Sequence, residues 1–132
     1  MDVVTAFLNP LLQEEVYMEL PEGYTLPCTS GGKLICRLQK CLYRLKQALR
    51  AWYSDIDAYL SSIGFTCSEE DYNLYISKHV LLLLFVDDML LFSPKMDAIQ
   101  TFKDLLHSKY KMTDIGPVQQ FLRIQVVQDW QV

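Results

Sequence analysis

Apolar residues recur at three- and four-residue steps through the middle of the chain. The first set that does so is Leu42, Leu45, Leu49, Trp52, Ile56, Tyr59, Leu60 and Ile63. This spacing places one apolar stripe on a helix and predicts an amphipathic helix over residues 42–63, with Gly64 as its stop. The same spacing predicts a second helix over residues 96–106, from Met96, Ile99, Phe102, Leu105 and Leu106.

Short apolar or alternating segments, bounded by turn residues, predict strands in the rest of the chain. We expect strands over residues 1–8, 14–20, 33–39, 71–78, 109–112 and 119–127. Residues 25–32 contain Pro, Ser and Gly and predict a loop, and Ile115-Gly116-Pro117 predicts a turn.

The apolar run over residues 80–92 (VLLLLFVDDMLLF) is compatible by composition with a helix or a hairpin. In a helix this apolar, the adjacent Asp87 and Asp88 would need partners that the neighbouring sequence does not supply. A hairpin with Val86-Asp87-Asp88 at its tip buries both strands and leaves the carboxylates in water, so we favour it. The run is too short to span a bilayer, and its two acids also argue against a membrane.

The order of these elements predicts an α+β fold, in which an antiparallel sheet packs against helices on one face. A chain of 132 residues with 51% apolar content is sufficient for one domain, residues 1–132. The four cysteines show no C-x-x-C spacing, which argues against zinc and fits a reduced, intracellular setting.

Charge is unevenly distributed along a chain whose net charge is -4. Residues 31–50 contain no acidic residue and hold six of the twelve basic ones: Lys33, Arg37, Lys40, Arg44, Lys46 and Arg50. A local positive stripe of this kind can bind phosphates even on an acidic protein. A solvated helix face would have the same composition, so both interpretations stay open.

Three carboxylates are candidates for metal chemistry. Asp2 lies in an apolar strand, and Asp87 and Asp88 lie at the predicted hairpin tip. If these strands are neighbours, the acids meet at one end of the sheet, as two-magnesium phosphoryl transfer requires. The ordinary alternatives are an Asp-Asp pair that serves only the turn and a solvated acid near a terminus.

Five blocks in order carry a family resemblance: MDVVTAFLN, EEVYMELPEGY, LYRLKQALRAWY, LLLLFVDDMLLF and KMTDIGPVQQFLRIQV. Together they resemble the reverse transcriptase (RNA-directed DNA polymerase) of copia-type LTR retrotransposons over essentially the whole chain. The resemblance implies a polymerase palm with the catalytic Asp-Asp at a hairpin tip. It implies that Asp2 and Asp87 are the main ligands of two Mg²⁺ ions, for which Mn²⁺ substitutes, and that Asp88 supports them.

The resemblance also implies roles for residues outside the carboxylates. Phe7 matches the aromatic position that selects deoxynucleotides, although an ordinary core aromatic would look the same. The nucleotide- or template-contacting positions are Tyr43, Lys46, Gln47 and Arg50, and the primer-holding positions are Phe121 and Leu122. Implied partners are an RNA or DNA template with primer, deoxynucleoside triphosphates and other Pol polyprotein segments. The implied setting is a cytoplasmic virus-like particle, with the nucleus as the alternative.

Several positions depart from the family pattern. Arg44 and Arg123 stand where the family has Gly, Leu49 where it has Pro, Phe85 where it has Tyr, and Pro10 follows Asn9 where it has Gly. Because Gly is used where the backbone needs a positive φ or a close approach, we expect an impaired copy. We also expect a truncated palm that lacks the N-terminal fingers part, thumb and RNase H. The rival interpretations are a non-catalytic nucleic-acid-binding module and an inert polyprotein fragment.

Overall fold

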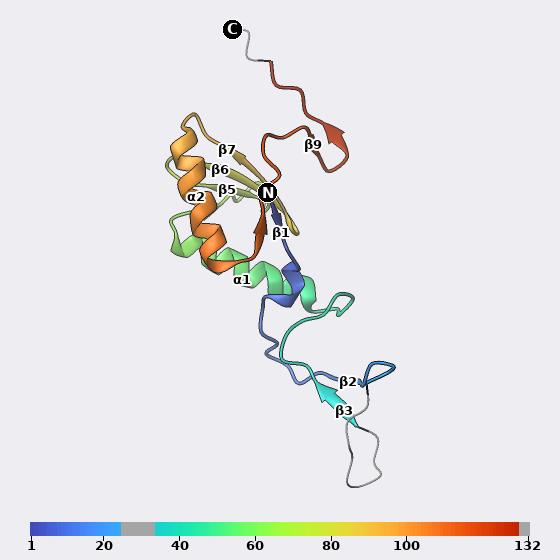
Figure 1. Cartoon of the computed structure of the whole chain (residues 1–132). Coiled ribbons are helices and arrows are strands. Elements are labelled where there is room, and N and C mark those ends of the chain that lie inside the picture. Colours follow the sequence, from blue (N-terminus) through green and yellow to red (C-terminus); the bar gives the residue numbers. More distant parts are fainter. Residues whose placement is uncertain (25–33, 130–132) are drawn as a thin grey trace.

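The structure, a computed structural model, describes residues 1–24 and 34–129. The predicted loop over residues 25–32 therefore lies outside the described residues, as does Lys33. In the described ranges, a six-stranded sheet is joined by two α-helices, and two separate two-stranded pairs extend from it (Figure 1).

The six-stranded sheet has the order β4-β5-β6-β7-β1-β8, and all its neighbouring strands are antiparallel. Its strands are β1 (Asp2–Val3), β4 (Thr66–Cys67), β5 (Leu74–Ile76), β6 (Leu81–Phe85), β7 (Asp88–Phe92) and β8 (Met112–Thr113). Strand β1 is inserted between β7 and β8, so the first residues of the chain lie well inside the sheet rather than at its edge.

Two helices bury one face of this sheet: α1 (Ala48–Ser62) and α2 (Met96–Lys109). The helices contribute Trp52, Ile56, Leu60, Phe102 and Leu106 to the core, and the sheet contributes Val3, Tyr75, Leu82, Leu84, Met89 and Met112. Alternate residues on the same strands, such as Leu81, Phe85 and Phe92, are more than two-fifths exposed. Since successive side chains of a strand point to opposite faces, this alternation leaves the second face open. The predicted α+β fold with helices on one face is confirmed.

The hairpin interpretation of residues 80–92 is correct. Strands β6 and β7 pair from Leu81↔Phe92 to Phe85↔Asp88, so a two-residue turn of Val86 and Asp87 joins them. Asp88 is therefore the first residue of β7 rather than part of the tip. No helix in the described part of the chain has the length and apolarity that a membrane crossing requires.

Two expected elements begin or end elsewhere because the backbone takes left-handed conformations. The predicted strand over residues 1–8 stops at Val3, and after Thr5, at φ 55°, the chain forms the 3-10 helix η1 (Ala6–Leu8). The predicted helix over residues 42–63 begins only at Ala48, because Arg44 at φ 73° does not fit a right-handed helix. The second helix continues to Lys109, so the strand predicted over residues 109–112 is wrong except for Met112.

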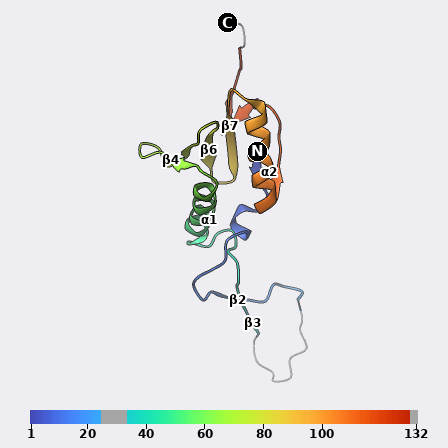
Figure 2. The same ribbon diagram turned by 90° about the vertical axis from the view of Figure 1, so that its left-hand side faces the viewer.

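The remaining strands form two small pairs outside the main sheet. Strand β2 (Tyr17–Glu19) pairs with β3 (Ile35–Arg37), and Figures 1 and 2 both show this pair well apart from the main sheet. Strands β9 (Gln120–Phe121) and β10 (Ile124–Gln125) form a hairpin near the C-terminal end of the chain. The strands predicted over residues 14–20 and 33–39 are confirmed but shorter, whereas residues 119–127 form a hairpin with a turn at Leu122 and Arg123. The two-residue strand β4 was not predicted.

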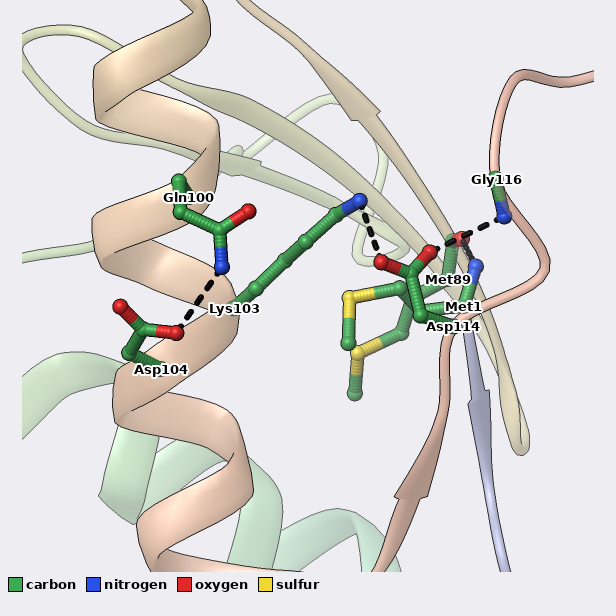
Figure 3. A network of polar contacts seen from close by, with 7 residues as sticks. All are labelled: Met1, Met89, Gln100, Lys103, Asp104, Asp114 and Gly116. Atoms are coloured by element: carbon green, nitrogen blue, oxygen red, sulfur yellow. Dashed lines mark hydrogen bonds and ion pairs between the residues drawn. The ribbon is translucent and has the colours of Figure 1, made fainter.

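An ion pair ties the segment after β8 to α2. The Lys103 Nζ atom lies 2.7 Å from Asp114 Oδ2, and the Gly116 N–H donates to Asp114 Oδ1 at 3.0 Å (Figure 3). Gly116 has φ 80°, which the predicted turn at residues 115–117 needs and which Gly adopts without strain. This loop leads into the β9–β10 hairpin.

Candidate active site

Asp2 and Asp88 are opposite each other on the neighbouring strands β1 and β7. The Val3 N–H donates to the Asp87 carbonyl at 2.9 Å, and the Met89 N–H donates to the Met1 carbonyl at 2.8 Å. These bonds flank the Asp2–Asp88 pair, which makes it a non-hydrogen-bonded antiparallel pair. In such a pair the Cα atoms lie about 4.5 Å apart and both side chains point to the same face. The strand register therefore brings together two of the three predicted carboxylates.

The two carboxylates lie on the open face of the sheet. Their neighbours Val3 and Met89 are buried against the helices, so the alternation of the strands directs Asp2 and Asp88 the other way. Asp87 follows in the β6–β7 turn, and all three acids are only partly buried. The register thus pairs Asp2 with Asp88, while the expected meeting of all three acids stays a prediction.

The turn that carries Asp87 has an unusual backbone. Val86 has φ 58°, a region that a β-branched residue rarely adopts. Its carbonyl accepts a hydrogen bond of 2.6 Å from Trp52 Nε1 in α1. The first half of α1 therefore lies against the turn that holds Asp87.

The electrostatics of the cluster favour a cation. Partial burial raises the pKa of Asp2, and the negative charges of Asp87 and Asp88 raise it further. Carboxylate oxygens are the ligands that Mg²⁺ prefers, and a bound cation would relieve this repulsion. In their present rotamers, no three His, Cys, Asp or Glu side chains in the described ranges gather around one point that could hold a metal. The donor chemistry of the three carboxylates fits a divalent cation.

An aromatic pair lies beyond the end of β1. The rings of Phe7 in η1 and Tyr43 before α1 meet edge to face, with centroids 4.9 Å apart and an interplanar angle of 85°. Phe7 is partly buried and packs against the core, whereas Tyr43 is 51% exposed. Figure 1 shows η1 beside the beginning of α1. The structure thus brings together two of the residues predicted for nucleotide contact, and the core role of Phe7 also holds.

The other predicted nucleotide or template residues lie at the beginning of α1. Lys46 and Arg50 are exposed, and Gln47 is the partly buried residue immediately before the helix. Arg37, from the same basic run, is the last residue of β3 and instead forms an ion pair of 3.1 Å with Glu15, which precedes β2. The predicted basic stripe is therefore divided, and its second half lies just before and within the beginning of α1.

The predicted primer-holding residues lie in the β9–β10 hairpin. Phe121 pairs with Ile124, and Leu122 and Arg123 form the two-residue turn between them, with φ 50° and 68°. Phe121 and Asp88 both line one groove of about 1030 Å³, which is also lined by Met96, Ile99 and Lys103 of α2. Leu122 is 40% exposed at the turn itself.

Both arginines that stand where the family has Gly have a positive φ, the backbone conformation that favours Gly. Arg44 has φ 73° and Arg123 has φ 68°, and both side chains are exposed. A residue with a Cβ atom is strained in this region by about 1–2 kcal/mol. The strain is therefore in the backbone, while the long side chains extend into solvent.

The sequence profile of the family described as reverse transcriptase (RNA-dependent DNA polymerase) matches residues 1–132. The chain belongs to this family, and its relatives make it a segment of the copia type.

Curated relatives come from plants and yeast. The chain is 38% identical over 135 residues to the retrovirus-related Pol polyprotein from transposon TNT 1-94 of Nicotiana tabacum, covering 98% of this chain and 10% of that protein. It is 34% identical over 129 residues to the corresponding polyprotein from transposon RE1 of Arabidopsis thaliana, covering 95% and 9%. A putative transposon Ty5-1 protein of Saccharomyces cerevisiae is 32% identical over 132 residues, covering 97% and 42%. The chain thus spans about a tenth of the two plant polyproteins. No solved structure matches it.

Proposed function

We propose that residues 1–132 form the palm segment of an RNA-directed DNA polymerase and carry its nucleotidyl-transfer site. The Asp2–Asp88 pair, with Asp87 in the adjoining turn on an open sheet face, is the observation that carries this proposal. The reaction forms a bond between the primer O3′ and the α-phosphorus of a deoxynucleoside triphosphate. It breaks the bond to the β-phosphate and releases pyrophosphate.

The carboxylates have the metal-binding role in this proposal. Asp2 and Asp87 would hold two Mg²⁺ or Mn²⁺ ions, and Asp88, the next residue along the chain, would support them. Such ions would supply charge neutralisation for the attacking and leaving oxygens. Partial burial, followed by the charges of Asp87 and Asp88, raises the pKa of Asp2, and a bound cation would relieve the repulsion among these carboxylates.

The residues around the carboxylates position the substrates. Phe7, held edge-on by Tyr43, limits space at the sugar 2′-carbon, and Lys46 and Arg50 neutralise phosphate charge. Tyr43 and Gln47 contact the template or the triphosphate. Phe121 and Leu122 hold the primer end, a role supported by the groove that Phe121 shares with Asp88.

The proposal extends to partners and setting. The substrates are an RNA or DNA template with primer and deoxynucleoside triphosphates, and other segments of a Pol polyprotein complete the grip on them. The compartment is a cytoplasmic particle, with the nucleus as the alternative.

A second candidate is a non-catalytic nucleic-acid-binding module. It is favoured by the exposed cations Arg44, Lys46 and Arg50, and by the present rotamers, which gather no three metal-binding groups within the described ranges. This function predicts binding that weakens steeply with salt and does not depend on a divalent ion.

Isothermal titration of Mg²⁺ and Mn²⁺ into the chain tests the primary proposal. We expect binding by the wild type, loss of binding by Asp87→Asn, and no change in Asp104→Asn. Asp104 is a suitable control because it is an exposed aspartate on α2 that is bonded to Gln100. Equal binding by the wild type and Asp87→Asn, or no binding by either, would contradict the metal site and favour the second candidate. A positive result would be followed by primer extension with a longer protein.

A further inference from the structure

Trp52 connects the core of the molecule to the turn that carries Asp87. Its ring is 1% exposed and packs edge-on against Tyr110, with centroids 5.3 Å apart. Its Nε1 atom is 2.6 Å from the Val86 carbonyl oxygen, although the two residues are 34 positions apart. An apolar ring would fill the same space, so the indole N–H has a task beyond packing.

The Val86 carbonyl needs a partner from outside the hairpin. Strands β6 and β7 pair as far as Phe85↔Asp88, and the carbonyl of the first turn residue lies beyond that last pair. Val86 is also held at φ 58°, a conformation that costs of order 1–3 kcal/mol and persists only where the surroundings fix it. The hydrogen bond from Trp52 is one contact that fixes it.

Hydrogen bonds anchor both peptide groups that flank Asp87. Trp52 Nε1 holds the carbonyl of the peptide before Asp87, and the Val3 N–H holds the carbonyl of the peptide after it at 2.9 Å. Fixing both peptide planes fixes φ and ψ of Asp87 and thus the direction of its Cα–Cβ bond. One anchor comes from α1, and the other comes from the strand that carries Asp2.

We propose that Trp52 is a positioning residue whose indole N–H orients Asp87 toward the Asp2–Asp88 pair. This inference rests on the proposed function, because the orientation matters for a divalent cation shared by these carboxylates. Groups that orient metal ligands without touching the metal typically contribute roughly 10–100-fold to metal affinity or activity. Trp52 acts in this way through the Val86 peptide group.

The test uses two variants that lack the N–H donor. In Trp52→Phe the N–H is lost together with part of the ring. In Trp52→benzothienylalanine, sulfur replaces the N–H and the ring shape is kept. The matched control is Tyr59→Phe, because the Tyr59 hydroxyl also donates from α1 to a backbone carbonyl at 2.6 Å, that of Leu105 in α2. Tyr59 also meets Tyr110 edge to face, at 5.5 Å.

Mn²⁺ titration is the first readout. We expect both Trp52 variants to bind Mn²⁺ roughly 10–100-fold more weakly, while Tyr59→Phe binds as the wild type does. Wild-type affinity in the benzothienylalanine variant would overturn the positioning role while leaving the metal site intact. A wild type that binds no Mn²⁺ would instead contradict the proposed function.

Amide hydrogen exchange, measured without metal, tests the positioning role of Trp52 whether or not the wild type binds Mn²⁺. The Val3 N–H, which is bonded to Asp87, should exchange faster in both Trp52 variants but not in Tyr59→Phe. The Ser68 N–H, bonded to the Leu74 carbonyl at the far edge of the sheet at 2.8 Å, is the internal reference. Unchanged protection of Val3, or equal acceleration at Val3 and Ser68, would mean that Trp52 serves only the core.

Discussion

Asp2 and Asp88 form a cross-strand pair of like charges on the neighbouring strands β1 and β7, with their side chains on the same face. Directly opposed like charges destabilise a sheet, by an amount comparable to the roughly 0.2–1 kcal/mol that favourable pairs contribute. The proposed metal chemistry uses this pair, whereas the fold alone would be more stable without it.

Asp88→Asn should therefore stabilise the metal-free chain by roughly 0.2–1 kcal/mol at neutral pH, because it removes one of the two opposed charges. The measurement is urea denaturation in the presence of a chelator. Asp104→Asn is the control and should give no gain. With excess Mg²⁺ the advantage should shrink, since the cation stabilises only the wild type; a destabilised Asp88→Asn would contradict this account.

Asp114 should stabilise the folded state at neutral pH and lose that effect in acid. A carboxylate that is repelled by its neighbours has the opposite dependence on pH. The bond from Lys103, followed by that from the Gly116 N–H, lowers its pKa below 3.8. The folded state thus binds the proton more weakly, and the stabilisation is present above pH 3.8 and lost as pH falls through the lowered pKa. We expect Asp114→Asn to be less stable than the wild type at pH 7.

The size of this effect is limited by exposure. The Asp114 side chain is 41% exposed, so solvent and salt screen the pair and the loss should stay below about 1 kcal/mol. Thermal unfolding from pH 2 to 7 measures it, and the two curves should converge in acid. A difference that persists at pH 2 would show that Asp114 acts through packing and not through its charge.

Arg44→Gly and Arg123→Gly should each stabilise the chain by about 1 kcal/mol, because Gly adopts the positive φ at these positions without the strain of a Cβ atom. Arg50→Gly is the matched control. Arg50 is also exposed but lies inside α1, where Gly costs about 1 kcal/mol. Denaturant midpoints compare the three variants, and a loss at both Arg44 and Arg123 would mean that their side chains make stabilising contacts.

The same substitutions bear on activity in a longer protein. Arg44→Gly, Leu49→Pro and Arg123→Gly together should raise primer extension by relieving strain beside the nucleotide and primer positions. Leu49 is the second residue of α1 and is 54% exposed, a place where Pro is tolerated. Asp87→Asn in the same background should abolish the gain. Unchanged extension would mean that these departures do not impair the enzyme.

The Phe7–Tyr43 contact should be measurable as a coupling energy. A double-mutant cycle with Phe7→Leu and Tyr43→Leu should give about 0.5–1.5 kcal/mol, the value typical of an edge-to-face aromatic pair. A cycle that pairs Phe7→Leu with Tyr72→Leu, an exposed tyrosine elsewhere in the chain, should give none. Coupling near zero in the first cycle would show that Tyr43 does not hold Phe7.

The two carboxylates in residues 80–92 predicted the β6–β7 hairpin, since composition alone left a helix open there. Periodicity in the sequence predicted both helices, because a long apolar stripe with one repeat leaves few alternatives. It did not predict the start of α1, since the apolar stripe continues through Leu42 and Leu45 while the backbone at Arg44 turns the other way. The two-residue strand β4 has too few residues for a periodic pattern.

The sequence predicted which residues form the candidate site better than it predicted how they are arranged. The sequence placed Asp2 and Asp87-Asp88 on separate apolar strands, but only the register shows that Asp88, and not Asp87, is opposite Asp2. Trp52 was predicted as one residue of an apolar stripe. Its bond to Val86 joins a helix to a distant turn, and no local pattern encodes such a contact.

The position of β1 determines how late the six-stranded sheet can finish forming during synthesis. Strand β1 pairs with β7 and with Met112–Thr113 of β8, so residues far apart in the sequence must meet. Non-local pairings of this kind are slow to form, because a long loop has to close first. The β6–β7 hairpin can form as soon as its own residues leave the ribosome, whereas Asp2 waits for both partner strands. The carboxylate cluster should therefore be among the last features to assemble in a nascent chain.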